Sequence, residues 1–275
     1  MKIIKSSFFS LITLLIFTCC GDGKEAQKRF DNAKALYDNK HFIAAKSEID
    51  SINILYPREI EVRKKALTLM RLVERGESVR NIEYCDSLIP ILTGKLPELK
   101  KGFVFEKDPT YDNIGNYIWS TMTIERNTER SYIRCGVDED GVMYVTSVYF
   151  GGSPINHTGL KLTAKEGYFA QTPSIPYDGG KNYRFNDMGR ISEIVTYKGE
   201  YCKPIADLIY LVDKERIKAE YTGGKAYSLY LSDNDKKAIK ATYELALVLN
   251  EINNLQNEKI KSEKRILLID EKLRD

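Results

Sequence analysis

The residues best suited to chemistry lie in one short loop, Gly151-Gly152-Ser153-Pro154-Ile155-Asn156-His157-Thr158-Gly159. A histidine near a hydroxyl group can act as a general base, because imidazole accepts a proton near neutral pH. We therefore take His157 and Ser153 as the candidate catalytic residues of a hydrolase. The interpretation that we favour is structural, with His157 bonded to a backbone carbonyl. His41, the only other histidine, is expected at the surface or as a helix cap.

Motifs for the commonest enzymatic chemistries are absent from the chain. It has no glycine-rich nucleotide fingerprint, no phosphate-binding loop, no H-E-x-x-H zinc motif, no C-x-x-C pair and no G-x-S-x-G serine motif. The acidic run Asp138-Glu139-Asp140-Gly141 passes directly into strand-like residues, whereas a calcium loop spreads its ligands over about 12 residues. We interpret this run as a hairpin turn, and we predict no metal site, no cofactor and no enzymatic activity.

Tyrosine is concentrated in the middle of the chain, where residues 99–231 hold 14 of the 18 tyrosines together with Trp119. Tyrosine combines a flat apolar ring with a polar tip, which suits surfaces that bind sugars or peptides. It also packs well in strands, and we expect packing to explain most of these residues. The candidate ligand-binding residues are Trp119 and three tyrosines in or beside loops that contain proline or glycine, namely Tyr111, Tyr168 and Tyr177.

The N-terminal residues have the proportions of a secretory signal peptide. Lys2 and Lys5 precede a ten-residue apolar run from Phe8 to Phe17. A membrane-spanning helix needs about 20 apolar residues, so this run is too short to be one. Two alternatives for this segment are an uncleaved membrane anchor and an ordinary secretory signal.

The segment Leu15-Ile16-Phe17-Thr18-Cys19-Cys20 resembles the lipobox of bacterial lipoproteins. The resemblance implies cleavage before a cysteine that then carries acyl chains, with Cys20 as the modified residue and Cys19 as the second choice. It further implies a signal peptide over residues 1–19, a lipid-anchored tether over 20–23 and a place in the cell envelope. We favour the outer membrane over the inner one; the sequence does not identify which face the protein occupies.

The remaining cysteines are Cys85, Cys135 and Cys202. Their odd number leaves at least one unpaired within a monomer. A disulfide between Cys135 and Cys202 is possible in an exported protein. We favour the alternative that all three are small buried thiols.

Residues 24–98 show helical spacing of apolar side chains. We expect one helix before Asp38, a second that Pro57 ends, and a third from Arg58 past Gly76 to Leu88, before Pro90. The first two resemble a single tetratricopeptide-type unit, through residues at that repeat's packing positions: Ala33, Leu36, Phe42, Ala45, Ile49, Ile52 and Pro57. A peptide-binding adaptor is what this resemblance implies, but one repeat is short of the three or so that a solenoid needs. We favour an ordinary helical hairpin.

Residues 99–232 predict a β-rich domain, since short runs of β-branched and aromatic residues alternate with turn formers. We expect strands over 102–105, 117–124, 131–137, 142–150, 160–164, 183–186, 191–197, 216–222 and 225–231. Asp140-Gly141 and Gly223-Gly224 are hairpin turns. Residues 201–212 predict a short helix with Pro204 in its first turn.

Residues 233–275 predict one long C-terminal helix. Its heptad seam runs through positions 238, 241, 245, 248, 252, 255, 259, 262, 266, 269 and 273, with a polar gap at Lys259 and Ser262. Such a seam must lie against the N-terminal helices, bind a partner or self-associate. We favour packing against the N-terminal helices, because both segments otherwise expose apolar faces.

Composition places the chain among folded proteins of nearly balanced charge. It has 42 basic and 39 acidic side chains and 43% hydrophobic residues, which excludes wholesale disorder and a strongly basic nucleic-acid binder. We predict an α+β fold, with a helical hairpin, a third helix and the C-terminal helix packed together and an antiparallel Tyr-rich β domain between them. The expected function is non-enzymatic binding or assembly, with a membrane as partner through the anchor, a protein partner through the C-terminal helix, and a glycan or peptide ligand.

The enzymatic and the binding interpretations make different demands on His157. A catalytic His157 must lie in a cleft, within about 3 Å of a nucleophile or carboxylate. In a binding module it should face a backbone carbonyl, with no other titratable group converging on it.

Overall fold

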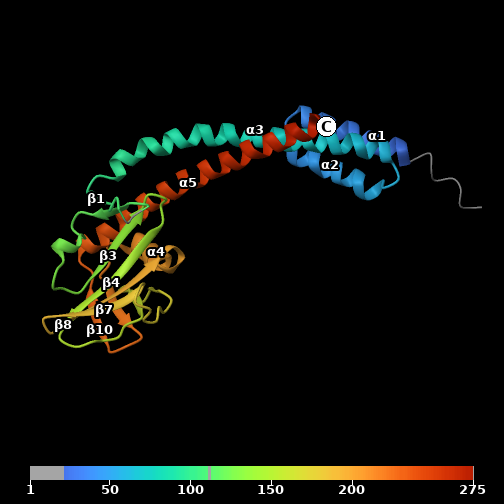
Figure 1. The fold of residues 1–275 in the computed structure, drawn as a ribbon. Helices are drawn as coiled ribbons and strands as arrows, with labels where there is room; N and C mark the ends of the chain where they lie inside the picture. Colours follow the sequence, from blue (N-terminus) through green and yellow to red (C-terminus); the bar gives the residue numbers. More distant parts are fainter. Residues whose placement is uncertain (1–21, 111–112, 275) are drawn as a thin grey trace, which may run out of the picture. The chain divides into compact units, whose positions relative to one another are not determined.

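The computed structural model describes residues 22–110 and 113–274, which form two compact units. The helical unit comprises residues 22–87 and 256–274, and the β unit comprises residues 88–255. The expected α+β class is confirmed, because an antiparallel β region follows three helices and precedes a long terminal helix (Figure 1). The candidate lipidation residues Cys19 and Cys20 lie outside the described residues, as does Tyr111.

Five α-helices and two short 3-10 helices are present in the described part of the chain. The α-helices are α1 (Asp22–Asp38), α2 (Phe42–Leu55), α3 (Ile60–Leu99), α4 (Lys203–Val212) and α5 (Asp233–Arg274), and the 3-10 helices are η1 (Ile124–Arg126) and η2 (Gly199–Tyr201). Because α1 begins at Asp22, part of the expected tether is helical. Across residues 22–110 and 113–274, no helix combines the length and the apolar character that crossing a membrane requires.

The core of the helical unit forms where α1, α2 and α3 bury their apolar positions. The buried residues recur at helical spacing and include Ala26, Ala33, Phe42, Ala45, Ile49, Ile52, Val62, Ala66, Leu69 and Val73. Position 76, inside α3, is a glycine because a Cβ there would be only 2.7 Å from the Phe42 ring. This packing suits an ordinary helical hairpin and a tetratricopeptide-type unit equally, since both bury the same positions.

The heptad seam of α5 faces inward along its whole length, since each of its positions is buried or half-buried. Within the helical unit the polar gap of the seam meets polar residues of α3. The Lys259 ammonium lies 2.5 Å from the Asp86 carboxylate, and the Asn81 amide donates to the Ser262 hydroxyl over 3.4 Å. The C-terminal end of α5 therefore packs with α3, as we expected from the two apolar faces.

Helix α3 continues through Pro90 and Pro97 to Leu99, so the expected end before Pro90 is wrong. Each proline removes one helical hydrogen bond and normally ends or kinks a helix. Here Leu96 and Leu99 pack against the core of the β unit. Tertiary burial of this last stretch therefore outweighs the local preference to stop.

The β unit holds a six-stranded and a four-stranded antiparallel sheet. The larger has the order β1-β2-β3-β4-β8-β7 and the smaller the order β10-β9-β5-β6. The strands are β1 (Phe103–Glu106), β2 (Asn116–Trp119), β3 (Tyr132–Asp138), β4 (Met143–Gly151), β5 (Gly159–Thr163), β6 (Phe169–Gln171), β7 (Asn182–Asp187), β8 (Arg190–Lys198), β9 (Lys218–Thr222) and β10 (Tyr227–Tyr230).

Two strand expectations need correction. The strand expected over 117–124 ends at Trp119, because the Asn127 amide donates to the Thr121 and Thr123 carbonyls, at 2.9 and 2.7 Å, and closes a turn. This turn places Met122 in the core. Strand β6 was not expected from the sequence. It is only three residues long, so its alternation is too short to register as a pattern.

The core of the β unit lies among the two sheets, α4 and the first half of α5. Cys85, Cys135 and Cys202 are all buried and free, which confirms the favoured expectation over a Cys135–Cys202 disulfide. Burial raises the pKa of Cys135 and of Cys202 to about 12. Both thiols therefore stay protonated at neutral pH and act as small apolar side chains.

Candidate functional site

His157 lies just before β5 and packs against the neighbouring strands β4 and β8 of the larger sheet. The antiparallel register pairs Ser147 with Val195 and Tyr149 with Glu193. Because side chains alternate along a strand, Ser147 and Glu193 project from the same face of the sheet. The loop that leads to β5 brings the His157 ring between them.

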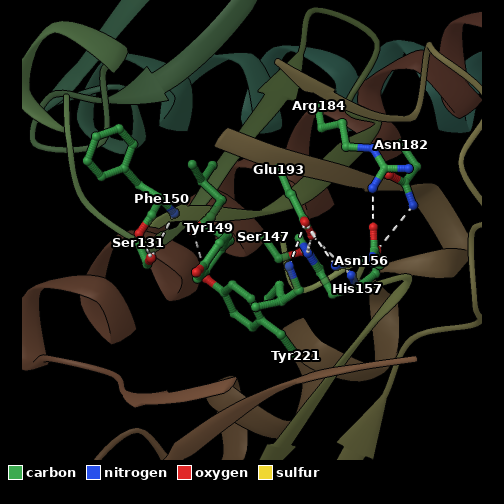
Figure 2. A network of polar contacts seen from close by, with 12 residues as sticks. Ser131, Ser147, Tyr149, Phe150, Asn156, His157, Asn182, Arg184, Glu193 and Tyr221 are labelled. Carbon is green, nitrogen blue, oxygen red and sulfur yellow. Dashed lines mark hydrogen bonds and ion pairs between the residues drawn. The ribbon is translucent and has the colours of Figure 1, made fainter. Parts of the chain in front are cut away.

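The His157 ring bridges a hydroxyl and a carboxylate (Figure 2). Its Nε2 atom lies 2.9 Å from Ser147 Oγ, and its Nδ1 atom lies 2.9 Å from Glu193 Oε2. An ionised carboxylate only accepts hydrogen bonds, so we assign the ring proton to Nδ1. Nε2 then accepts the Ser147 proton. One flank of the ring is covered by Tyr221, which stacks on it with centroids 4.8 Å apart.

Glu193 also holds the backbone of the loop. Its Oε1 atom accepts from the amides of Ile155 and Asn156, each at 2.8 Å, and Oε2 accepts from the amide of His157 at 3.1 Å. With the His157 ring this makes four donors on one carboxylate. Paired in this way, a buried charge and three backbone amides satisfy one another.

Two pKa shifts follow from this arrangement. Burial lowers the pKa of His157, and hydrogen bonding to Glu193 only partly opposes that shift. Burial alone would raise the pKa of Glu193, but hydrogen bonds from the Asn156 and His157 backbone and from the imidazole together lower it. At neutral pH the pair is therefore a neutral imidazole beside an ionised carboxylate.

The order serine, histidine, carboxylate is that of a hydrolase triad, but the serine has no access to solvent. Ser147 is 0% exposed, His157 1% and Glu193 2%. A hollow of about 230 Å³ lies beside the network, and its walls come from Asn156, His157, Thr158, Tyr177, Asn182, Arg184 and Glu193. Ser147 is not among these residues, so a molecule in the hollow does not reach the hydroxyl.

The expectation that Ser153 is the serine beside the His157 ring is wrong, because that serine is Ser147. Ser153 makes no contact with the ring; its carbonyl accepts the Tyr149 hydroxyl at 3.0 Å. The expectation that no other titratable group converges on His157 is also wrong, because the Glu193 carboxylate lies 2.9 Å from its Nδ1 atom. His157 thus lies within the distance of a hydroxyl and a carboxylate that catalysis requires. The hydroxyl, that of Ser147, is nevertheless inaccessible to a substrate. His41 is exposed before α2 and makes no side-chain cap.

The aromatic candidates divide into packed and exposed residues. Trp119 is half-buried and packs edge-on against Phe103, with ring centroids 5.0 Å apart. Tyr168 and Tyr177 are 60% and 58% exposed, as expected for loop tyrosines. Tyr177 lines the hollow, and the Arg184 guanidinium lies 4.9 Å from its ring centroid. The hollow therefore joins one predicted ligand-binding residue to the loop of His157.

The described residues contain no cluster of three or more His, Cys, Asp or Glu side chains that could hold a metal ion. The acidic run at 138–141 forms the β3–β4 hairpin turn. Its Asp138 carboxylate accepts from the Val142 amide at 2.8 Å and pairs with Lys198 at 3.0 Å.

Comparison with known proteins adds no relative. Family models, curated proteins and solved structures all give no match to this chain. The interpretation of the site therefore depends on its own geometry.

The buried imidazole predicts an acid-sensitive β unit. An unfolded chain binds a proton at His157 near pH 6.5, whereas the folded unit binds it only at lower pH. The free energy of unfolding should therefore decrease as the pH falls from about 6.5 through the folded pKa, and the lowered pKa of Glu193 extends the loss below pH 4.5. Urea unfolding followed through the fluorescence of Trp119 as a function of pH measures this.

The two histidines of the chain provide a matched pair for that measurement. In His157→Gln the decrease that begins near pH 6.5 should disappear, and only the part below pH 4.5 should remain. In His41→Gln the whole profile should match the parent protein. A decrease near pH 6.5 that persists in His157→Gln would contradict the assignment.

Proposed function

We propose that this protein is a lipoprotein of the bacterial cell envelope whose β unit is a non-catalytic binding module. The observation that carries the binding role is the burial of Ser147, because a nucleophile with no exposed surface and no contact with the hollow is not placed to attack a substrate. The network of Ser147, His157 and Glu193 then serves to fix the loop that forms one wall of the hollow.

The anchoring part of the proposal is supported by the sequence of residues 8–20. Acyl chains on Cys20 would hold the protein at a bilayer, since each buried methylene contributes about 0.8 kcal/mol and several chains act together. Through this anchor the protein would bind a membrane, and we favour the outer membrane. The β unit would remain free to meet a small ligand, a glycan or a peptide.

Lipid attachment is tested by expressing the full chain in a bacterial host with labelled palmitate and by partitioning it in detergent. The parent protein should carry label and enter the detergent phase. Cys20→Ser should lose both properties, because the acceptor thiol is gone. The matched control Cys19→Ser should keep both. Label that survives in Cys20→Ser but not in Cys19→Ser would move the site, and an unlabelled parent would overturn the anchor.

A hydrolase is the second candidate, since the hydrogen-bonded order of Ser147, His157 and Glu193 favours it. A fluorophosphonate probe distinguishes the two functions because it reacts only with an accessible, activated serine. We expect no labelling of the full-length folded chain. If the parent protein is labelled and Ser147→Ala is not, the binding function is wrong. The protein would then be a hydrolase whose β unit opens to expose Ser147.

A further inference from the structure

The hollow beside His157 contains a positive charge without a negative partner. Arg184 lies on β7, directly opposite Glu193 in the antiparallel register. Glu193 is not its ion-pair partner, because the four donors of the loop already occupy that carboxylate. Among the ion pairs of the described residues, Arg184 takes part in none. Its charge is therefore available to a ligand.

The guanidinium of Arg184 is held in place on two sides, and Figure 2 shows the side on which it meets Asn156. Its central carbon lies over the ring of Tyr177, 4.9 Å from the centroid, and Nη1 donates to the side-chain oxygen of Asn156. Asn156 has a φ of +58°, in the left-handed region, and Glu193 accepts a hydrogen bond from its backbone amide. A guanidinium held in this way loses little further freedom when it binds an anion.

The other residues that line the hollow indicate which chemical groups a ligand carries besides its anionic group. Thr158 contributes a hydroxyl and Asn156 an amide. The Asn182 amide nitrogen already donates to the His157 and Ile175 carbonyls, at 3.2 and 2.7 Å, so Asn182 offers a ligand its side-chain oxygen. A volume of about 230 Å³ is below the range of about 300–1,000 Å³ for drug-sized ligands, so the hollow fits one small unit. A flat carboxylate matches the parallel N–H donors of arginine, and several hydroxyls match amides and threonine beside an aromatic ring.

We propose that this hollow binds a sugar acid, with the carboxylate on Arg184 and the hydroxyls on Asn156, Thr158 and Asn182. The inference rests on the proposed binding role of the β unit and is independent of the lipid anchor. Three observations carry it together: an arginine with no ion-pair partner, its fixation by Tyr177 and Asn156, and a hollow of single-sugar size whose lining combines polar side chains with an aromatic ring.

The test is calorimetric titration of the full-length chain in detergent with glucuronate, glucose, acetate and inorganic phosphate. Glucuronate should bind, and glucose and acetate should each bind at least about tenfold more weakly, because each lacks one half of the recognised chemistry. Phosphate that binds as well as glucuronate would overturn the sugar-acid assignment. So would the absence of glucuronate binding at millimolar concentration.

Arg184→Gln should weaken glucuronate binding by at least about tenfold. The matched control is Arg190→Gln, since Arg190 also lies over an aromatic ring, that of Phe150, but does not line the hollow. Its affinity should equal that of the parent, and equal affinity in Arg184→Gln would overturn the proposal. Both side chains are exposed, and unchanged thermal unfolding verifies that the variants fold. Cys20→Ser should keep full affinity, so a failed anchor and a failed ligand assignment give different results.

Discussion

Replacement of Glu193 by alanine should lower the free energy of unfolding of the β unit by about 3–5 kcal/mol, because it removes the acceptor of three backbone amides and of the His157 ring. The truncation leaves the amides of Ile155, Asn156 and His157 without an acceptor in a buried site, and each unsatisfied buried donor costs about 1–3 kcal/mol. Trp119 is the only tryptophan of the chain and belongs to the β unit. Urea unfolding followed by its fluorescence therefore reports on the unit that carries the change.

Two further variants define the origin of that loss. Glu193→Gln keeps one side-chain oxygen for the loop amides and should fall between the parent protein and Glu193→Ala. Glu200→Ala removes an exposed carboxylate from η2 and should change stability by less than about 0.5 kcal/mol. If Glu193→Ala were as mild as Glu200→Ala, the loop would not depend on this carboxylate, and a structural role for the network would be untenable.

The candidate site was only partly predictable from the sequence. His157 was found because histidine is rare in this chain and lies in a glycine-rich loop. Ser153 shares the loop with His157, whereas the actual partners come from strands that precede and follow the loop. Sheet pairing brings Ser147 and Glu193 together, and a single sequence does not specify which strands are neighbours.

A signal for Glu193 was nevertheless present. Along β8 the inward positions hold Glu193, Val195 and Tyr197, so a charged residue occupies one place in an otherwise apolar alternation. A charge at such a position needs a buried partner, and the isolated His157 was available to supply it. Ser147 gave no comparable signal, because serine is acceptable on either face of a strand.

The fold was predicted best where a pattern repeats over many residues. The heptad seam of α5 predicted an inward face over its whole length, and the structure confirms it. Prediction was poorer where one contact decides the outcome. The amide of Asn127 ends the strand expected through Ile124, and packing of Leu99 extends α3 beyond two prolines. The turn at Asn127 depends on the direction of one side chain, and the packing of Leu99 depends on partners far along the chain, and local propensity describes neither.

The proposed ligand site follows from the same division of roles. Glu193 is committed to the loop, which fixes Asn156 and leaves Arg184 unpaired across the strands. A structural carboxylate thus leaves the charge of the hollow unpaired, because the acid opposite Arg184 in the sheet already accepts four hydrogen bonds. Stability variants at Glu193 and binding variants at Arg184 therefore examine two consequences of one arrangement.

Replacement of Gly141 by alanine should lower the free energy of unfolding by about 3 kcal/mol or more. Gly141 occupies the β3–β4 hairpin turn with a φ of +84°, where an alanine costs about 1–2 kcal/mol. A Cβ there would also be 2.2 Å from the backbone nitrogen of Asn250 on α5. Backbone does not yield as a flexible side chain does, so about 1–3 kcal/mol of overpacking is added. The same fluorescence-detected unfolding measures the loss.

Gly167 separates the two contributions to that loss. It has a similar φ of +87°, but nothing lies within 4 Å of the position where a Cβ would be. Gly167→Ala should therefore cost only the conformational part, about 1–2 kcal/mol. The difference between the two variants measures how closely the hairpin packs on α5 inside the β unit. Equal losses at Gly141 and Gly167 would mean that this contact is looser than the structure has it, since only the turn conformation would then be felt.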